Sequence, residues 1–196
     1  MADNASGRGI AEEKLIRAAG ELLSEVGPRA ASVRAVASRA GVNHGLVHHY
    51  FGSKESLLRA AMTRLVEDHA AFAKDMAKGA SVPAPFALLH DQPYLRAVMR
   101  CVLDGEMELA TTELDAGVSI PRHVVSELAA HRGQNTPDVK TQAAVGIGMA
   151  MEMGWAALEP FIFAVVGATP DEEASVRAEA VALRNAIART WIGAAE

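Results

Sequence analysis

The chain has 196 residues, of which 50% are hydrophobic and 22% are charged, and its formal net charge is −5. This composition is ordinary for a soluble globular protein that buries a core. Aromatic residues make up only 5% and alanine is abundant, which favours helices over sheets. The single cysteine, Cys101, excludes an internal disulfide and suits a reducing cytoplasm.

Charge is distributed unevenly along the chain. Residues 1–60 carry eight Lys or Arg and six Asp or Glu, whereas residues 61–196 carry eleven and eighteen. A mildly basic first quarter ahead of an acidic remainder predicts two tasks, one of which involves an anion. The polar residues 1–9 contain no apolar signal-peptide core, so we expect a loose arm on a cytoplasmic protein.

The first quarter carries the pattern of short helices separated by glycines. Apolar residues recur at helical spacing over residues 11–26, and Gly27-Pro28 predicts the end of that helix. Ser32 is expected to cap a second, short helix. Gly41 is expected to take a positive φ in the turn that follows it.

Two further caps complete this pattern. Asn43 is expected to cap a third helix and Ser53 a fourth. A short helix, a glycine turn and another short helix form a helix-turn-helix, in which small alanines allow the helices to cross closely. The third helix keeps a polar outer face suited to the major groove of DNA.

Three stretches of this region are AAGELLSEVG, SVRAVASRAGV and GLVHHYFGSKESLL, and the last contains HYFGSKE from His49 to Glu55. Residues 10–58 thereby resemble the DNA-binding domain of the TetR family of bacterial transcriptional regulators. The resemblance implies an all-α fold with an N-terminal three-helix helix-turn-helix domain at residues 1–52, including the arm at residues 1–9. A C-terminal helical domain for effector binding and dimerisation is expected at residues 53–196.

The resemblance also implies which residues contact DNA. The recognition helix corresponds to residues 43–50, and His49 and Tyr50 resemble the family's phosphate-contacting pair. Lys54 is expected near the DNA backbone, where the helix dipole also favours an anion. The full set of expected DNA contacts is Ser32, Arg34, Asn43, His44, Gly45, Leu46, His48, His49, Tyr50 and Lys54.

Two positions in the expected recognition helix depart from the family pattern. His48 stands where the family commonly has tyrosine, and Leu46 stands where a small hydroxyl residue is frequent. Leu46 either touches a thymine methyl group or packs inward.

The histidines of the third helix admit other interpretations. His44 and His48 are four residues apart and share a helix face, which suits metal chelation and suggests a metal-dependent enzyme as one alternative. No third ligand pattern and no Gly-x-Ser-x-Gly elbow accompanies them. We therefore predict DNA contact or a solvated helix surface, and expect no enzymatic activity, metal or cofactor.

The remaining sequence predicts further helices. Thr136-Pro137 and Thr169-Pro170 are expected helix starts, with threonine as the cap and Glu172 completing a capping box at the second. The expected helices lie at residues 54–78, 94–109, 124–130, 138–166, with a kink at Pro160, and 170–192. Residues 143–168 are long enough to span a membrane, but Glu152 and Glu159 favour a buried helix of a soluble protein.

The last two helices resemble the family's dimerisation bundle. Their apolar stripe is also compatible with an ordinary core. The residues expected at the dimer interface are Val176, Ala180, Leu183, Ile187 and Trp191. The resemblance then implies a homodimer that binds a palindromic operator on double-stranded DNA.

A small-molecule effector, apolar or amphiphilic, is expected to release this repressor from its operator. Methionines and aromatic residues suit an adaptable apolar pocket, although ordinary core packing explains each of them as well. The candidate pocket residues are Phe86, Met99, Met107, Met149, Glu152, Met153 and Trp155. Glu152, Trp155 and Glu159 share a helix face, which suggests a cationic amphiphile. The alternative function is a constitutive or activating regulator without a working pocket.

Overall fold

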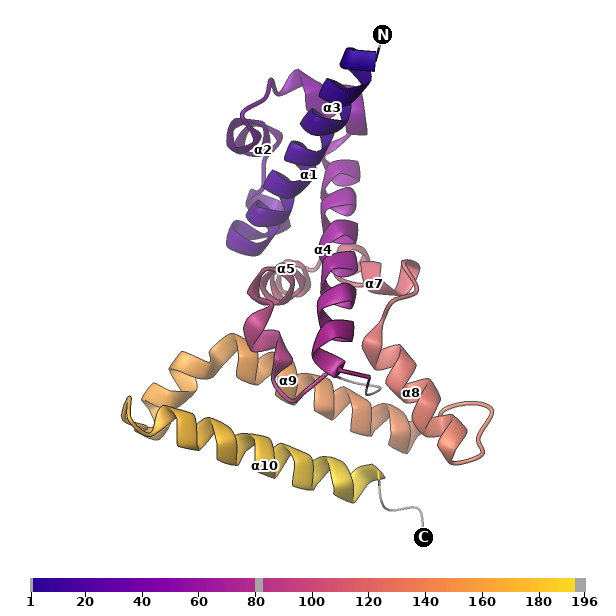
Figure 1. Cartoon of the computed structure of the whole chain (residues 1–196), viewed down its shortest axis with the longest axis vertical. Helices are drawn as coiled ribbons and strands as arrows, with labels where there is room; N and C mark the ends of the chain where they lie inside the picture. Colours follow the sequence, from indigo (N-terminus) through magenta and orange to yellow (C-terminus); the bar gives the residue numbers. More distant parts are fainter. Residues whose placement is uncertain (1, 80–82, 193–196) are drawn as a thin grey trace. The chain divides into compact units, whose positions relative to one another are not determined.

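The computed structural model describes residues 2–79 and 83–192, and the side chains of residues 9–79 and 83–190. Every regular element within these residues is a helix (Figure 1), which confirms the all-α prediction. In chain order the elements are α1 (Ala2–Ala30), α2 (Val33–Ala40), α3 (Gly45–Phe51), α4 (Lys54–Ala77), η1 (Ala87–His90), α5 (Gln92–Leu103), α6 (Met107–Ala110), α7 (Thr112–Asp115), α8 (Ile120–His131), α9 (Val139–Val166) and α10 (Glu173–Ile192).

The chain forms two compact units. The first unit comprises Met1–Ala71 and Gln92–Val118, and the second comprises Phe72–Asp91 and Ser119–Glu196. This division differs from the expected domain boundary after residue 52. The first unit also includes most of α4, whose Leu57 and Met62 are completely buried, and all of α5, which packs against α1.

The first unit has a continuous apolar core. Helix α1 packs against α2 and α5, and its Leu15 and Leu23 are completely buried. Leu57 of α4 and Leu95 of α5 are buried in the same unit. Each fully buried leucine contributes about 1.5–3 kcal/mol of hydrophobic stabilisation. The helix-turn-helix is therefore held by a core larger than its own three helices.

Helix α1 is interrupted where the sequence predicts its end. Gly27 has φ 80° and ψ 171°, and Pro28 follows it, so the α-helical hydrogen-bonding pattern breaks here. Beyond the break, Nη2 of Arg29 donates a 2.6 Å hydrogen bond to the carbonyl oxygen of Asp104. Nε of Arg100 donates a 3.0 Å hydrogen bond to the carbonyl oxygen of Ser24. These contacts satisfy carbonyl groups near the helix ends.

The prediction of a loose N-terminal arm at residues 1–9 is wrong. Helix α1 begins at Ala2, so the described backbone of the arm is helical and continuous with the first core helix. The physical reason is that alanine is the strongest helix former, and this segment contains Ala2 and Ala5. Residue 1 lies outside the described residues.

The prediction of one continuous helix over residues 94–109 is also wrong. Helix α5 ends at Leu103, and Gly105 takes φ 78° before the one-turn helix α6 starts. The amide of Glu106 donates to the carbonyl oxygen of Cys101 across this turn, at 2.9 Å. Such a hydrogen bond closes a helix end around a left-handed glycine.

The start of α9 was expected at Thr136, but the cap is Asp138. Its Oδ1 accepts a 2.7 Å hydrogen bond from the amide of Thr141. A carboxylate is the better cap because it carries a full negative charge at the positive end of the helix. The capping box expected at Thr169 is partly present, because Glu172 accepts a 2.9 Å hydrogen bond from the amide of Thr169. Helix α10 begins at Glu173, three residues after the expected start at residue 170.

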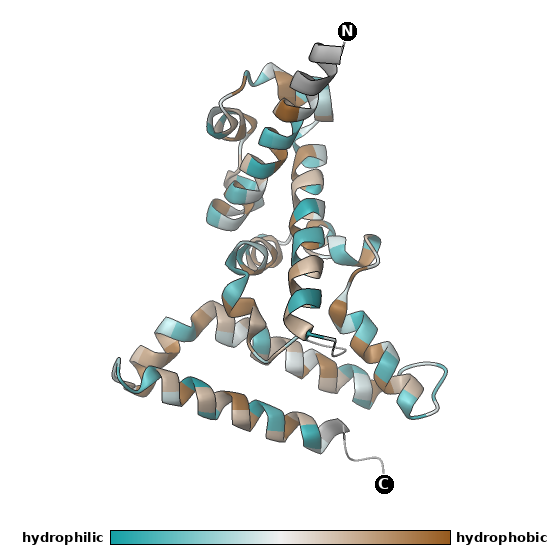
Figure 2. Cartoon of the chain, viewed as in Figure 1, coloured by the Kyte–Doolittle hydropathy of each residue, from teal (hydrophilic) through white to brown (hydrophobic). Residues whose placement is uncertain are grey.

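Helix α9 is not the buried helix that its composition predicted. It is long and apolar enough to cross a membrane, and much of it is coloured white to brown in Figure 2, yet only 11% of its most apolar window is buried. Such a single helix is weak evidence for a membrane span. The one interior proline, Pro160, lies within the continuous helix. Within the second unit, α9 therefore keeps an uncovered apolar face.

Candidate nucleic-acid interface

Helix α2 and the turn after it are fixed by local hydrogen bonds. The side chain of Ser32 accepts a 3.1 Å hydrogen bond from the amide of Ala35, which confirms the predicted cap. Gly41 has φ 66°, and the amide of Val42 donates to the carbonyl oxygen of Ala37 at 3.0 Å. The left-handed glycine therefore turns the chain sharply toward α3.

The start of α3 is set by an asparagine turn. Oδ1 of Asn43 accepts a 2.8 Å hydrogen bond from the amide of Gly45. Asn43 thus performs the predicted capping task two residues before the helix, although His44 occupies the formal cap position and makes no side-chain capping bond. A side chain at position 45 would meet this oxygen at 3.3 Å, so the glycine permits the tight entry.

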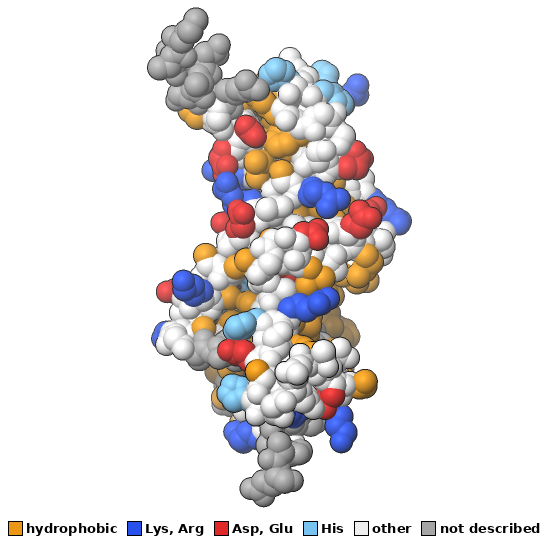
Figure 3. All heavy atoms as spheres, turned by 90° about the vertical axis from the view of Figure 1, so that its right-hand side faces the viewer, with side chains coloured by type: hydrophobic (Ala, Val, Ile, Leu, Met, Phe, Trp, Pro, Cys, Tyr) orange, Lys and Arg blue, Asp and Glu red, His pale blue; other side chains and the backbone are white. Residues whose placement is uncertain are grey.

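Helix α3 separates a buried face from an exposed one. Val47 is completely buried. The exposed residues at its start and on its outer side are Asn43, His44, Gly45, His48 and His49. Figure 3 shows histidine side chains gathered over the part of the first unit where Figure 1 places α3. This exposed face carries five of the ten predicted DNA contacts.

The histidines of α3 make contacts within the chain. Nδ1 of His48 lies 3.2 Å from the carbonyl oxygen of Gly52, so this ring also closes the end of α3. The rings of His49 and Tyr50 meet edge to face with centroids 5.0 Å apart. Among the residues that the structure describes, no group of three or more His, Cys, Asp or Glu could hold a metal ion.

The other expected DNA contacts differ in exposure. Ser32 and Arg34 are exposed, whereas Leu46 and Tyr50 are half-buried. Lys54 turns back on its own chain, where Nζ donates a 3.4 Å hydrogen bond to the carbonyl oxygen of Arg29. Arg34 is therefore better placed than Lys54 to meet a phosphate without first breaking an internal contact.

Arg39 is engaged with α1. Its Nη1 lies 2.7 Å from Oε2 of Glu25 and 3.7 Å from Oε2 of Glu21. The positive charge near the carboxyl end of α2 is thereby balanced by the two glutamates of α1, and such an exposed ion pair contributes little to the free energy of unfolding. Arg34 is therefore the residue of α2 whose positive charge is not balanced by α1 in these ion pairs.

The predicted effector pocket is divided between the two units. Met99 and Met107 belong to the first unit, and Met107 is exposed. Phe86 and Trp155 belong to the second unit and stack with ring centroids 5.1 Å apart at 18°. Phe163 of α9 meets Trp155 edge-on, with ring centroids 6.1 Å apart.

The two glutamates beside this aromatic cluster are each paired with an arginine of α10. Arg177 binds Glu159 through two hydrogen bonds of 2.6 and 2.8 Å, which lower the pKa of that carboxyl group. Nη2 of Arg184 lies 3.0 Å from Oε1 of Glu152. Burial raises the pKa of Glu152, and Arg184 opposes that effect. Paired carboxylates offer little to a cationic amphiphile, which argues against that suggestion.

These two arginines are the residues that the sequence interpretation missed. Glu152 and Glu159 are seven residues apart, and so are Arg177 and Arg184. Equal spacing with opposite charge is what two antiparallel helices require for two pairs in register. The signal was present, but it identifies a site only when the two helices are considered together.

The expected dimer residues lie on α10 with mixed exposure. Leu183 and Ile187 are exposed, whereas Val176 and Ala180 are half-buried. The side chain of Trp191 lies outside the described residues. The structure therefore leaves part of this stripe available for a partner.

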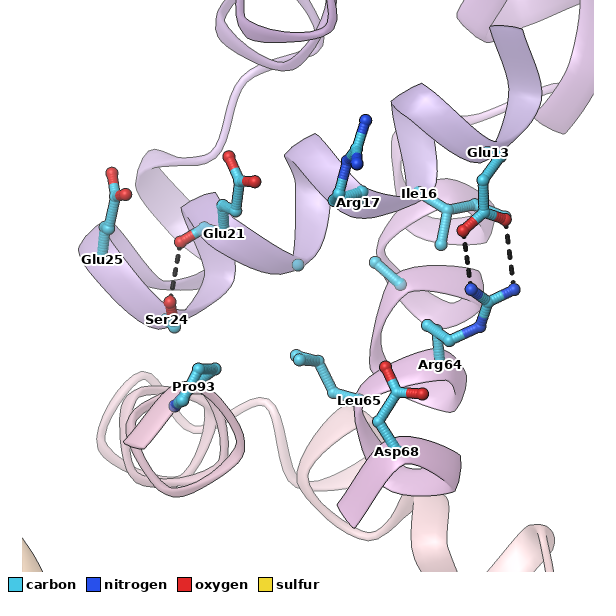
Figure 4. Close-up of a pocket in the computed structure, with 12 residues that line it drawn as sticks. Glu13, Ile16, Arg17, Glu21, Ser24, Glu25, Arg64, Leu65, Asp68 and Pro93 are labelled. Atoms are coloured by element: carbon cyan, nitrogen blue, oxygen red, sulfur yellow. Dashed lines mark hydrogen bonds and ion pairs between the residues drawn. The ribbon is translucent and has the colours of Figure 1, made fainter. Parts of the chain in front are cut away.

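A separate surface groove lies in the first unit, between α1, α4 and α5 (Figure 4). It has a volume of about 390 Å³, and its floor includes Ile16 and Leu65. Across it, Arg64 binds Glu13 with two hydrogen bonds of 2.6 and 3.1 Å. None of the predicted pocket residues lines this groove.

Comparisons with known proteins point to one family. Residues 15–61 match the family model described as bacterial regulatory proteins, tetR family. The HTH-type transcriptional repressor Rv3405c of Mycobacterium tuberculosis is 28% identical over 162 residues, covering 83% of this chain and 80% of that protein. The HTH-type transcriptional regulator BetI of Stenotrophomonas maltophilia is 41% identical over 59 residues, covering 30% of each chain.

A solved structure extends the likeness to the fold of nearly the whole chain. The crystal structure of a tetR-family transcriptional regulator from Streptomyces coelicolor aligns with a TM-score of 0.57 and 20% identity. The alignment covers 94% of this chain and 85% of that one. Together with the helix-turn-helix geometry, these similarities show that residues 15–61 form a TetR-type helix-turn-helix and that the chain is similar over most of its length to DNA-binding transcriptional regulators of the TetR family.

Proposed function

We propose that this DNA-binding regulator is a homodimeric repressor in the cytoplasm, which binds a palindromic operator through α3 and is released by a small-molecule effector. The observation that carries the proposal is the division of α3 into a buried face at Val47 and an exposed face at His44, His48 and His49. A short helix presented in this way fits the major groove. A relative named as a repressor supports repression over activation.

Dimerisation is supported by the uncovered face of α9. Ile147, Leu158, Phe161 and Val165 recur at helical spacing on this helix and are all at least half exposed. In the second unit the large apolar side chains with less than a tenth of their surface exposed are Phe86 and Phe163, within the described residues. A second copy of the chain would supply the missing apolar cover. Two copies also account for a palindrome, because each contributes one recognition helix.

Effector release is supported by the aromatic cluster around Phe86 and Trp155, which belongs to the second unit rather than to the helix-turn-helix. We propose that the effector binds at this cluster. Of the expected pocket residues, the site would then include Phe86, Met149, Glu152, Met153 and Trp155. An effector acts there only by binding one conformation of the dimer better than another.

The proposal is tested by fluorescence anisotropy with duplex DNA from upstream of the protein's own gene, at two salt concentrations. We expect salt-sensitive binding to a palindrome, since phosphate contacts release counterions. Arg34→Ala and His49→Ala should each weaken binding about tenfold, in line with a loss of about 1–3 kcal/mol per contact. Lys74→Ala is the matched control, because Lys74 is an exposed cation outside the first unit.

The outcomes separate the alternatives. Binding that Lys74→Ala weakens as much as Arg34→Ala would contradict a specific role for the α2–α3 surface. Binding that no small molecule reduces would favour the constitutive regulator. Absence of DNA binding by a folded dimer would overturn the repressor assignment.

A further inference from the structure

Phe86 has an unfavourable backbone conformation. Its φ is 59° and its ψ is 27°, in the left-handed region that bulky side chains rarely occupy. Such a conformation persists only where surrounding contacts hold it, and it occurs preferentially at ligand sites and switches. The contacts that hold Phe86 therefore indicate what this position does.

Two contacts hold Phe86 in place. Its amide donates a 2.6 Å hydrogen bond to Oε2 of Glu152. Its ring stacks on Trp155 with centroids 5.1 Å apart and planes at 18°. The residue is 5% exposed, so its ring fills a slot rather than lying on the surface. Phe86 thus presents two groups to α9: its aromatic ring stacks on Trp155, and its backbone N–H donates to Glu152.

The slot has walls that do not depend on Phe86. Nε1 of Trp155 donates a 2.9 Å hydrogen bond to Glu159, which Arg177 holds with two further bonds. Phe163 packs edge-on against the indole, and the Arg177 guanidinium lies 5.4 Å from the Phe163 ring centroid. The indole plane is therefore positioned for stacking whether or not Phe86 covers it.

Displacing Phe86 would leave a specific vacancy at Glu152. Its Oε1 forms a 3.0 Å ion pair with Arg184 but accepts no hydrogen bond from the described residues, and its Oε2 would lose the amide donor. A buried acceptor without a donor is unfavourable, so the incoming group must carry one. A neutral donor fits best, because Arg184 already balances the carboxylate charge and an added cation would be unpaired.

We propose that Phe86 is the chain's own occupant of an aryl-binding slot on α9, and that the natural ligand is a planar aromatic molecule with a neutral N–H or O–H donor close to its ring. The ligand stacks on Trp155 and donates to Glu152, while Phe86 leaves the slot and relaxes from its left-handed conformation. Only the role of this ligand as effector rests on the proposed function. The binding site stands without it.

The slot is tested by the fluorescence of Trp155. The sequence has two tryptophans, so a Trp191→Phe background makes Trp155 the sole reporter. The probe is N-phenethylacetamide, which joins a phenyl ring to an amide N–H through a short linker. We expect it to bind the Trp191→Phe parent and to change Trp155 emission. Phe86→Gly should bind about tenfold more tightly or better, because the competing ring is gone and glycine tolerates the backbone conformation.

Three controls define the chemistry. The N-methyl analogue of the probe lacks the donor, and the cyclohexyl analogue lacks the aromatic face, so both should bind at least about tenfold more weakly. Val139→Ala, which truncates an exposed apolar residue at the start of the same helix, should leave probe affinity unchanged. Phe86→Leu is a second variant that keeps a bulky side chain, and its affinity should lie between those of the parent and Phe86→Gly.

The inference is overturned if the parent does not bind the probe, even when Phe86→Gly does, since an engineered cavity accepts many small apolar molecules. It is equally overturned if both analogues bind as well as the probe. DNA anisotropy is measured separately: intact DNA binding without probe binding removes this inference and leaves the proposed function. Probe binding without operator release supports the slot and contradicts its role as the effector site.

Discussion

A Cβ atom on Gly27 would lie 3.0 Å from Oδ2 of Asp104 and 3.3 Å from Cβ of Arg100. The break in α1 and the carboxyl end of α5 therefore meet so closely that a side chain at position 27 fits only if Asp104 or Arg100 shifts by a few tenths of an ångström. Gly27 also has φ 80° and ψ 171°, a region that only glycine occupies readily. Backbone conformation and packing thus impose the same requirement at this joint within the first unit.

Gly27→Ala should lower the free energy of unfolding by about 2–4 kcal/mol, because it adds a backbone penalty of about 1–3 kcal/mol to a steric clash. Denaturant titration followed by circular dichroism measures the change. Gly41→Asn is the control, since Gly41 has φ 66° with nothing within 4 Å of the added Cβ, and asparagine tolerates that conformation. An equal loss in both variants would contradict the role given to the joint.

The helix-turn-helix was largely predictable because its signals are local. Ser32, Gly41 and Asn43 each act on a backbone group within a few residues, and the structure shows each of them doing so. The burial of Val47 on the inner side of α3 follows from helical spacing alone. Helix caps and turns of this kind depend on neighbouring residues and hardly on the rest of the fold.

The second unit was harder to predict because its interactions join distant segments. The pairs of Glu152 with Arg184 and of Glu159 with Arg177 require α9 and α10 to run antiparallel in one register. Phe86 reaches α9 from a segment 66 residues away in the sequence. Periodicity within one helix assigns a face to each residue but does not name the partner of that face. Apolar composition likewise predicted burial of α9 without distinguishing the chain's own core from a partner chain.

The cap of α9 predicts a particular pH dependence. Hydrogen bonds from the amide and hydroxyl of Thr141, and from Gln134, lower the pKa of Asp138 from its ordinary value to about 2. Because the pKa is depressed on folding, the stabilisation is present above the ordinary pKa and is lost as the pH falls toward 2. Asp138→Asn keeps an acceptor but carries no charge, so it should be less stable than the parent at neutral pH.

The melting temperatures of the parent and Asp138→Asn, measured from pH 6 down to pH 2, check this expectation. Their difference should be constant above about pH 4 and should shrink between about pH 4 and pH 2. Asp138→Ala, which removes the acceptor as well as the charge, should stay below both proteins at every pH. A difference between parent and Asp138→Asn that persists unchanged at pH 2 would show that the charge of Asp138 does not stabilise α9.

The uncovered face of α9 predicts the residues on which dimerisation depends. Phe161 is 63% exposed and Val165 is 67% exposed, one helical turn apart. A glutamate at either position would bury an unpaired charge if a second copy packs there. We expect Phe161→Glu to weaken dimerisation by about thirtyfold or more, the effect of losing one interface hot spot of about 2 kcal/mol.

Light scattering coupled to size-exclusion chromatography, over a dilution series, measures the dissociation constant of each variant. Leu103→Glu is the matched control, because Leu103 is 79% exposed but belongs to the first unit. Its dimerisation should equal that of the parent. If Leu103→Glu dissociates the dimer and Phe161→Glu does not, the interface lies away from this face of α9. If Phe161→Glu yields a folded monomer, its affinity for a palindrome should fall toward that of a single recognition helix, because the two half-sites are no longer bound by one particle.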